Sequence, residues 1–267
     1  MPESPGLSDK IMCMKKYKVS LISYLNSKPF LFGLLNSPVI HEIELHLDMP
    51  SLTAAKLATN QTDIGLIPVG ALVDLPDYHI ISDHCIGSVG PVRTVVLASN
   101  VPLEEVDTIL LDYQSRSSVL LIRTLAYHFW KREFRWENTS GDFEKNRIAG
   151  HTAGVVIGDR VFEVEKRYPY IWDLSSEWMK FTGFPFVFAV WVSQKQLPPS
   201  FLDRFKEAIA FGVNNVREVE KSEQSKFPDV DIFEYFTRNI SYNLDEPKLA
   251  GMNRFLQLAR EMESTGL

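Results

Sequence analysis

The 267-residue chain contains only two cysteines, Cys13 and Cys85, which excludes a disulfide framework and a cysteine-rich zinc site. It has no run of about 18 apolar residues, so we expect no membrane-spanning helix. The N-terminal segment lacks the apolar core of a signal peptide, and we predict a disordered tail at residues 1–16. These absences favour a reduced, cytoplasmic protein that does not contact the membrane.

Basic residues are also fewer than acidic ones. The chain has 28 Lys and Arg against 34 Asp and Glu, a net charge of −6, which excludes a general electropositive surface and a nucleic-acid partner. The motifs H-E-x-x-H, G-x-G-x-x-G, G-x-x-x-x-G-K-[ST] and G-x-S-x-G are missing as well. The sequence therefore predicts no metal, no cofactor and no serine nucleophile.

Apolar residues are plentiful, at 45% with 12% aromatic, so the chain can bury a core. Short β-branched or alternating runs predict strands, and apolar residues at helical spacing predict helices between them. The predicted strands are 17–22, 43–47, 63–69, 92–98, 108–111, 154–159, 170–174 and 186–192. The order β-α-β-α-β up to residue 69 indicates a parallel sheet flanked by helices.

The alternation of strands and helices predicts two α/β lobes. We expect residues 17–96 plus 191–267 to form the first lobe and residues 97–190 the second. The apolar runs 92–98 and 186–192 would then cross between the lobes, and a small molecule would bind in the cleft. The alternative is a single continuous doubly wound sheet.

The segment Gln114–Ser118 lies between a predicted strand and a predicted helix. A helix N-terminus presents unpaired N–H groups and a positive dipole end, so hydroxyls and Arg116 there are suited to bind an anion. The alternative is ordinary N-capping by Ser115 or Ser117, with Arg116 in solvent.

Two further loops carry neutral hydrogen-bonding groups. Asn26 follows the first strand, at the sheet end where α/β proteins bind ligands, although it could simply stabilise its own turn. Ser88 begins a Ser-Val-Gly-Pro segment that offers a hydroxyl and a close backbone approach, or only a tight turn.

These loops, taken in order, resemble one known family. The matching segments are 23–29, 63–69, 88–95, 112–119, 157–159 and 178–189. They are similar to the chorismate dehydratases of the futalosine route to menaquinone, from about residue 17 to residue 192 and more loosely through the C-terminal helices. Departures are small: Thr94 and Ser118 keep a hydroxyl, and Val161-Phe162 is bulkier than the usual Ala-Leu.

The resemblance implies a two-lobed, periplasmic-binding-protein-like (type II) α/β fold with a ligand cleft between the lobes. It further implies a cytoplasmic lyase that needs no cofactor and eliminates water from chorismate to give 3-[(1-carboxyvinyl)oxy]benzoate. One alternative is the 1,4-dihydroxy-6-naphthoate synthase of the same route, but that enzyme has His-Glu where this chain has Gly158-Asp159. Another is a solute-binding protein without chemistry, which the missing export signal disfavours.

We expect Asn26 and Ser88 to act as donors near the reacting ring, and the substrate's own enolpyruvyl carboxylate to take the proton. The expected substrate-binding residues are Ser23, Tyr24, Gly90, Arg93, Ser115, Arg116, Ser117, Ser118, Asp159, Thr182 and Gly183.

Overall fold

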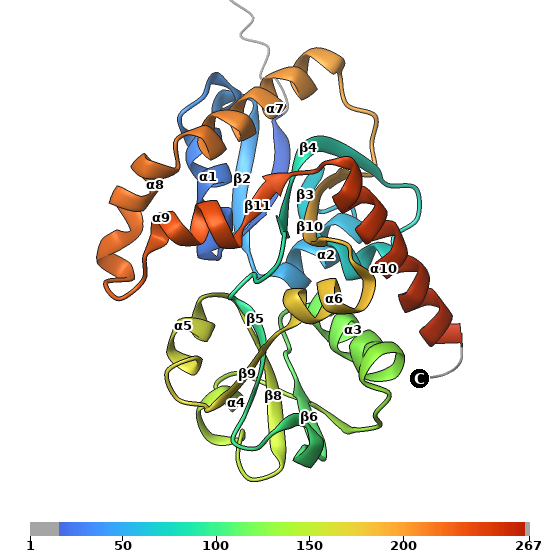
Figure 1. Cartoon of the computed structure of the whole chain (residues 1–267). Coiled ribbons are helices and arrows are strands. Elements are labelled where there is room, and N and C mark those ends of the chain that lie inside the picture. The colour runs from blue at the N-terminus through green and yellow to red at the C-terminus, as the bar shows by residue number, and fades with distance from the viewer. Residues whose placement is uncertain (1–15, 265–267) are drawn as a thin grey trace, which may run out of the picture.

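The computed structural model describes residues 16–264, which form two β-sheets flanked by helices (Figure 1). The strands are β1 (Tyr17–Ile22), β2 (Ile43–Asp48), β3 (Ile64–Pro68), β4 (His79–Ser88), β5 (Val95–Ser99), β6 (Thr108–Leu111), β7 (Arg135–Asn138), β8 (Thr152–Ile157), β9 (Tyr170–Asp173), β10 (Phe186–Ser193) and β11 (Ser241–Asn243). The helices are α1 (Lys28–Leu35), α2 (Pro50–Ala58), α3 (Arg116–Thr124), α4 (Phe143–Asn146), α5 (Val161–Val164), α6 (Leu174–Thr182), α7 (Pro199–Asn214), α8 (Val216–Glu223), α9 (Ile232–Glu234) and α10 (Glu246–Ser264). Apart from residue 16, the expected tail at residues 1–16 lies outside the described residues.

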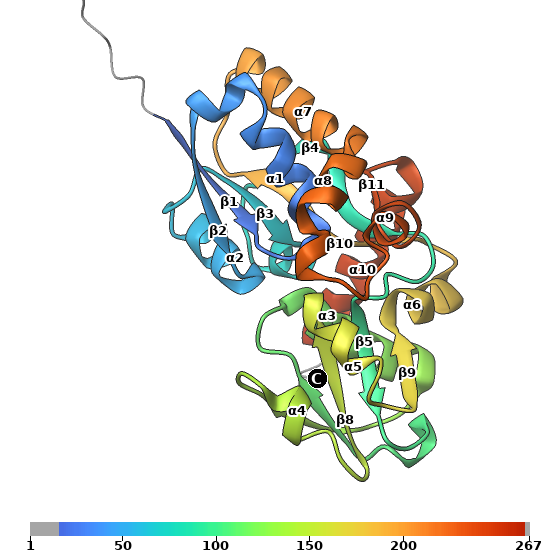
Figure 2. The same ribbon diagram turned by 90° about the vertical axis from the view of Figure 1, so that its left-hand side faces the viewer.

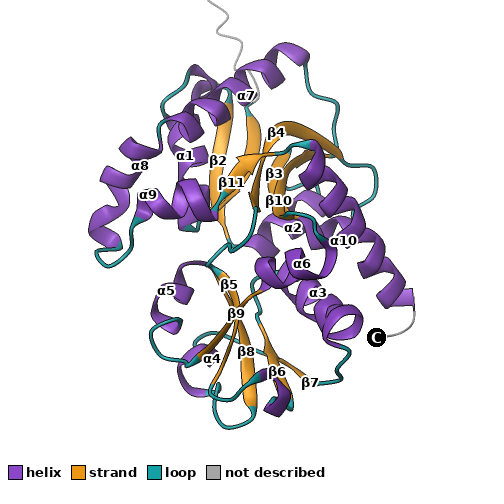
Figure 3. Ribbon diagram, viewed as in Figure 1, coloured by secondary structure: helices purple, strands orange, loops and turns teal. Residues whose placement is uncertain are grey.

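The two sheets belong to two lobes, one above the other in Figure 1. The upper lobe contains a six-stranded sheet in the order β11-β4-β10-β3-β1-β2, and the lower lobe a five-stranded sheet in the order β7-β6-β8-β5-β9. Figure 3 shows the strands of each lobe, in orange, bordered by purple helices. The predicted two-lobed α/β fold is confirmed, and a single continuous sheet is excluded.

The upper sheet begins as the sequence predicts, with β1 paired in parallel to both β2 and β3. The later strand β10 then inserts between β3 and β4 and runs antiparallel to both. All eight of its residues are buried, which explains its uninterrupted apolar sequence. This central strand brings Phe188 and Ala189 to the face of the upper lobe that meets the lower one.

The chain crosses between the sheets at 89–94 and again just before β10. The runs 92–98 and 186–192, expected to be crossovers, instead contribute β5 to the lower sheet and β10 to the upper. The first connection cannot be a strand, because Gly90 and Arg93 have φ of 91° and 67°. We therefore propose lobe boundaries at residues 89–94 and 183–185, in place of the expected 96/97 and 190/191.

The C-terminal helices cover the upper lobe and extend to the lower one. Helix α7 packs on α1 and β4, whereas α10 packs on β10 and also on α3 of the lower lobe. Figure 2, turned by 90°, shows α7 and α8 lying along the outer side of the upper sheet. None of the helices within residues 16–264 is long and apolar enough to cross a bilayer.

Candidate functional site

A pocket lies between the two lobes. The upper lobe contributes Ile22, Tyr24, Asn26, Pro50, Pro68, Ile86, Phe188 and Ala189, and the lower lobe with its first connection contributes Val92, Thr94, Val95, Ser115, Ser118, Ile157 and Gly158. The centre of a water-sized sphere can occupy about 40 Å³ of this pocket, and all the empty space, including solvent at its open mouth, is about 460 Å³. Largely apolar walls with a few polar groups among them are typical of a site that binds and orients a small organic ligand.

Helix α3 begins at the pocket. Ser115 is its N-cap: the Ser115 Oγ accepts from the Ser118 backbone N–H at 3.3 Å and from the Ser118 hydroxyl at 3.2 Å. The N–H groups of a first helical turn have no partner within the helix, and the dipole there is positive. The expected N-cap and the expected anion site are therefore compatible at this helix start.

The two residues between these serines point elsewhere, because successive helix positions turn by about 100°. The Ser117 hydroxyl accepts from the Gly70 N–H at 2.8 Å and donates to the Phe188 carbonyl at 3.2 Å, so it joins the lobes. Arg116 forms an ion pair with Asp74 outside the pocket. No lysine or arginine is among the pocket-lining residues of the described chain.

Asn26 occupies a single 3-10 turn, Leu25–Ser27, directly after β1. That turn is held by Ser27, whose N–H and hydroxyl both donate to the Tyr24 carbonyl, at 3.1 and 2.8 Å. The Asn26 Oδ1 atom is buried and has no hydrogen-bond partner. The side chain therefore does not stabilise its own turn, and a buried acceptor beside a pocket is suited to a ligand's donor.

Hydrogen bonds hold the two lobes together around this turn. The Tyr24 hydroxyl donates to the Gln114 side-chain oxygen, and the Ser51 N–H donates to the Gln114 carbonyl at 3.1 Å. Burial, together with the nearby Asp112 carboxylate, holds the pKa of Tyr24 far above its ordinary value, so this phenol remains a donor. The lobes are thus closed over the pocket.

Gly158 permits this closure. Its φ is 67°, and a Cβ atom there would lie 2.8 Å from the Tyr24 ring. The expected site residue Asp159 follows it, and its carboxylate accepts from the Leu25 N–H at 3.0 and 3.2 Å, another bond between the lobes. Gly158-Asp159 is therefore a contact point between the lobes, with the glycine in the pocket wall.

Several expected site residues lie outside the pocket wall. Ser88 is fully buried, and its hydroxyl lies 2.5 Å from that of Ser175 in α6. The Arg93 guanidinium bonds Glu165 at 2.7 and 3.2 Å, and its backbone N–H donates to Asp173 at 2.6 Å. Both residues support the first connection between the lobes instead of facing the pocket.

The four remaining expected substrate-binding residues also lie outside the pocket wall. Thr182 donates to the Trp178 carbonyl at 2.9 Å, and Gly183, at a φ of 76°, ends α6. Gly90 lies in the first connection and Ser23 is exposed beside the Tyr24 turn. The prediction that these four residues touch the substrate has no support from their positions.

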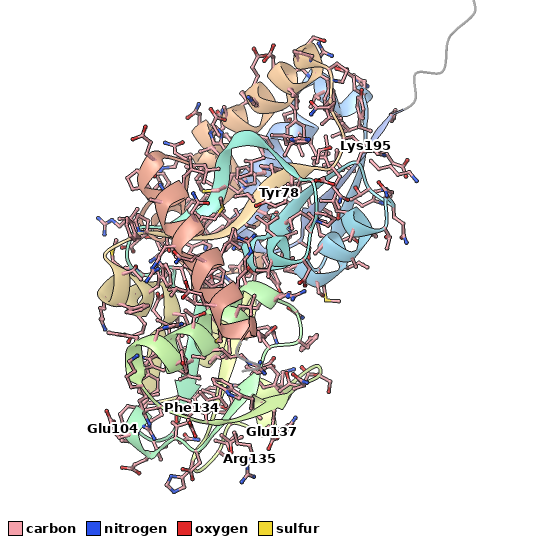
Figure 4. All side chains as sticks on the ribbon, turned by 90° about the vertical axis from the view of Figure 1, so that its right-hand side faces the viewer. Tyr78, Glu104, Phe134, Arg135, Glu137 and Lys195 are labelled. Atoms are coloured by element: carbon pink, nitrogen blue, oxygen red, sulfur yellow. The ribbon has the colours of Figure 1, made fainter. Side chains whose placement is uncertain are left out.

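Sequence reasoning missed other parts of the wall. Thr94, Gly158 and Phe188 lie inside the matched segments but are not among the predicted site residues. Among residues 16–264, no three His, Cys, Asp or Glu side chains are grouped so that they could hold a metal ion. In Figure 4, Glu104, Phe134 and Arg135 mark the end of the lower lobe that is remote from the pocket.

Asp159 gives a testable dependence of stability on pH. Burial raises the pKa of its carboxyl from 3.8 to about 6, although the Leu25 N–H opposes that shift. The folded chain therefore binds the proton more tightly than the unfolded chain, so this stabilising contribution is complete below pH 4 and is lost as the pH rises through 6. Asp159→Asn keeps an acceptor without charge, and its unfolding free energy should exceed that of the wild type above pH 6 by about 3 kcal/mol.

Urea unfolding of both proteins from pH 4 to about 7 measures that difference. Asp203→Asn, which removes an exposed carboxylate from α7, is the matched control and should follow the wild type. Identical pH dependence in the wild type and Asp159→Asn would contradict the assignment.

Comparisons with known proteins agree with this geometry. A family described as menaquinone biosynthesis matches residues 17–261. A curated chorismate dehydratase from Thermus thermophilus is 24% identical over 269 residues, covering 91% of this chain and 95% of that protein.

Among solved structures, a protein from Archaeoglobus fulgidus has a TM-score of 0.72 at 14% identity, covering 93% of this chain and 98% of its own. A Candida albicans protein with the generic periplasmic binding protein fold scores 0.61 at 15% identity, covering 92% of this chain and 90% of its own. The periplasmic aliphatic sulphonate binding protein of Escherichia coli scores 0.57 at 10% identity, with 93% of both chains covered. These likenesses establish a periplasmic-binding-protein-like fold.

Proposed function

The chain belongs to the menaquinone biosynthesis family, and from that premise we propose that it is a chorismate dehydratase. The Thermus thermophilus relative of that name supports the proposal over nearly the whole chain. The structural observation that carries it is the largely apolar pocket between the lobes, in which the start of α3 and the unpaired Asn26 amide oxygen are available to an anionic, hydroxylated ring.

The reaction removes water from chorismate and leaves 3-[(1-carboxyvinyl)oxy]benzoate. The proton is taken from the ring carbon that bears the enolpyruvyl ether, and the C–H electrons pass through the adjacent double bond toward the ring carboxylate. Their return expels the hydroxyl group from the neighbouring ring carbon, and the released proton completes the water molecule. The new double bond makes the ring aromatic, which drives the elimination.

Charge stabilisation and positioning are the contributions of this chain. The N-terminus of α3, with Ser115 and Ser118, is suited to hold one substrate carboxylate without a cationic side chain. Asn26 is suited to bond the reacting part of the ring. Ser88 and Arg93 would support the connection between the lobes.

The proton acceptor is proposed to be the substrate's own enolpyruvyl carboxylate. The pocket wall contains no histidine, lysine, aspartate or glutamate among its described residues. Tyr24 keeps its proton because burial raises its pKa. A chorismate analogue that lacks the enolpyruvyl carboxylate should therefore bind but react far more slowly, and an undiminished rate would contradict this part of the mechanism.

Incubation of the purified chain with chorismate tests the proposal directly. The expected result is an aromatic product lighter than chorismate by one water molecule, followed by ultraviolet absorbance and mass spectrometry. Saturable binding without product would make the chain a binding protein, as the aliphatic sulphonate binding protein of Escherichia coli is named. Turnover of a cyclised futalosine derivative to 1,4-dihydroxy-6-naphthoate, with chorismate left intact, would instead identify the sister enzyme.

Ser118→Asp tests the anion site at α3. The new carboxylate should repel a substrate carboxylate and raise KM at least about tenfold, which corresponds to about 1.4 kcal/mol of binding free energy. Ser200→Asp places the same charge near the start of α7, away from the pocket, and is the matched control. Steady-state kinetics measures both variants, and a KM within about twofold of wild type for Ser118→Asp would place the carboxylate elsewhere.

A further inference from the structure

A second cavity lies in the lower lobe, at the end of α3 that is remote from the pocket between the lobes. Its wall comes from the end of α3, the π-helical segment Leu125–Trp130, the loop before β7, β7 itself and α10. Phe134, labelled in Figure 4, is one of its wall residues. The centre of a water-sized sphere can occupy about 500 Å³ of this cavity, which is within the range of small-molecule sites. Among the described residues the two cavities have no wall residue in common.

Arg123 brings an unpaired cation to this wall. Its guanidinium carbon lies 5.5 Å from the centroid of the Trp136 ring, a cation–π contact that holds the group in place. The Nε atom is buried, yet within residues 16–264 the guanidinium has neither a hydrogen-bond partner nor an ion pair. Its two terminal nitrogens are not among the buried unpaired atoms, so they are open to an acceptor. A carboxylate matches this fork of donors.

Two further cations lie at the same cavity. Arg132, in the wall, donates to two backbone carbonyls, and the Lys131 ammonium lies 5.9 Å from the ring centroid of Tyr127, another wall residue. Neither cation forms an ion pair within the described part of the chain. Glu133 is the acidic residue of the described wall, and it is exposed. The local charge is therefore positive in a chain with a net charge of −6, which favours an anionic ligand.

The rest of the wall favours a flat ring. Tyr127, Phe134 and Trp136 all line the cavity, and the rings of the last two pack at 5.8 Å with their planes inclined by 68°. Tyr127 is 47% exposed, so its ring has surface left for a ligand to cover. It belongs to the π-helical segment, a conformation that is rare and frequently found at functional sites. An aromatic ligand can stack on such rings or meet them edge-on.

We propose that this cavity is a binding site for a small aromatic carboxylate, separate from the pocket between the lobes. Arg123 binds the carboxylate, while Tyr127 and Trp136 contact the ring. Occupancy of this site requires no reaction, so it goes beyond the proposed function and does not depend on it.

Titration of the unmodified chain with three probes tests the chemistry of the ligand. Benzoate should show saturable binding in a calorimeter. Benzamide has the same ring without the charge, and acetate has the charge without the ring, so each should bind at least about tenfold more weakly than benzoate.

Arg123→Gln tests the cation. It removes the charge and the fork of donors, so benzoate should bind at least about tenfold more weakly. Arg135→Gln is the matched control, because Arg135 is an exposed arginine of β7 that is not in the wall, and its affinity for benzoate should equal that of wild type.

Methionine methyl NMR locates the bound benzoate. Met262 is in the wall of this cavity, whereas Met49 precedes Pro50 of the pocket between the lobes. Benzoate should shift the methyl signal of Met262 and leave that of Met49 in place. Ser118→Asp, which puts a carboxylate into the other pocket, should bind benzoate as tightly as wild type does.

Three results together support the proposal: preference for benzoate over benzamide, a shift at Met262, and weaker binding in Arg123→Gln alone. Absence of saturation, equal binding of benzamide, or unchanged affinity in a folded Arg123→Gln variant would overturn it. A shift at Met49 with loss of binding in Ser118→Asp would also overturn it, because benzoate would then occupy the pocket between the lobes. If Arg123→Gln does not fold, the probe series and the methyl signals of the unmodified chain still decide. None of these results measures turnover, so each leaves the proposed function intact.

Discussion

Leucine at position 26 is expected to lower kcat and kcat/KM together by about 10²–10³-fold, because a preorganised polar group at the reacting ring is lost. Asn26→Leu keeps the approximate volume but removes the open Oδ1 acceptor. The turn itself should persist, since Ser27 supplies its hydrogen bonds. Steady-state kinetics with chorismate measures the loss.

Asn36→Leu is the matched control for this variant. Asn36 ends α1 and donates to the Phe32 carbonyl at 2.8 Å, so its replacement also removes an amide hydrogen bond, on the exposed surface. Its kcat should stay near that of wild type. A variant at position 26 with a lower melting temperature but a normal kcat per folded molecule would remove Asn26 from the catalytic residues.

Alanine at Gly158 should prevent the lobes from closing fully. A Cβ atom there would lie 2.8 Å from the Tyr24 ring, much closer than the two groups can approach. Overpacking of this kind costs about 1–3 kcal/mol. If that cost falls on the closed state alone, kcat/KM should fall by roughly 5–150-fold, while each lobe remains folded.

Gly150→Ala separates this effect from backbone strain. Gly150 has a φ of 55°, but nothing lies within 4 Å of the position its Cβ would occupy. Both variants should therefore lose about 1–2 kcal/mol of stability through the left-handed backbone. Gly158→Ala alone should lose kcat/KM, and an equal loss in the two variants would show that the Tyr24 contact does not limit closure.

Much of the sheet framework could be predicted from sequence, because most strands are apolar and several match the structure to within a residue. Strand β4 was missed because Ser82, Asp83 and His84 interrupt its pattern. The structure places a register shift against β10 at that stretch, between the pairings of Cys85 and Ile80. A bulge breaks the alternation on which the prediction depends.

Other elements were missed for different reasons. Strands β7 and β11 are edge strands of four and three residues, so pairing with their neighbours defines them more than their own sequence does. Helix α6 had a readable signal: Asp173 caps it by accepting from the Ser176 N–H at 2.9 Å, and Leu174 and Trp178 are buried four residues apart. The sequence analysis predicts the strand at 170–174 but no helix after it.

The candidate site was predictable as a set of loops but not as a set of side chains. The Asn26 turn and the start of α3, both singled out from the sequence, line the same pocket. Motif resemblance could not tell Ser115 and Ser118, which line the pocket, from Ser117, which joins the lobes.

The position of β10 also dictates an order of assembly during synthesis. All strands of the lower sheet lie within residues 95–173, so they can pair before β10 has left the ribosome. Until Phe186–Ser193 is inserted, β3 and β4 each lack their shared neighbour, and the upper sheet remains in two parts. The partly made chain then exposes the unpaired edge of a fully buried apolar strand, so this is the stage at which it is most open to aggregation and most in need of a chaperone.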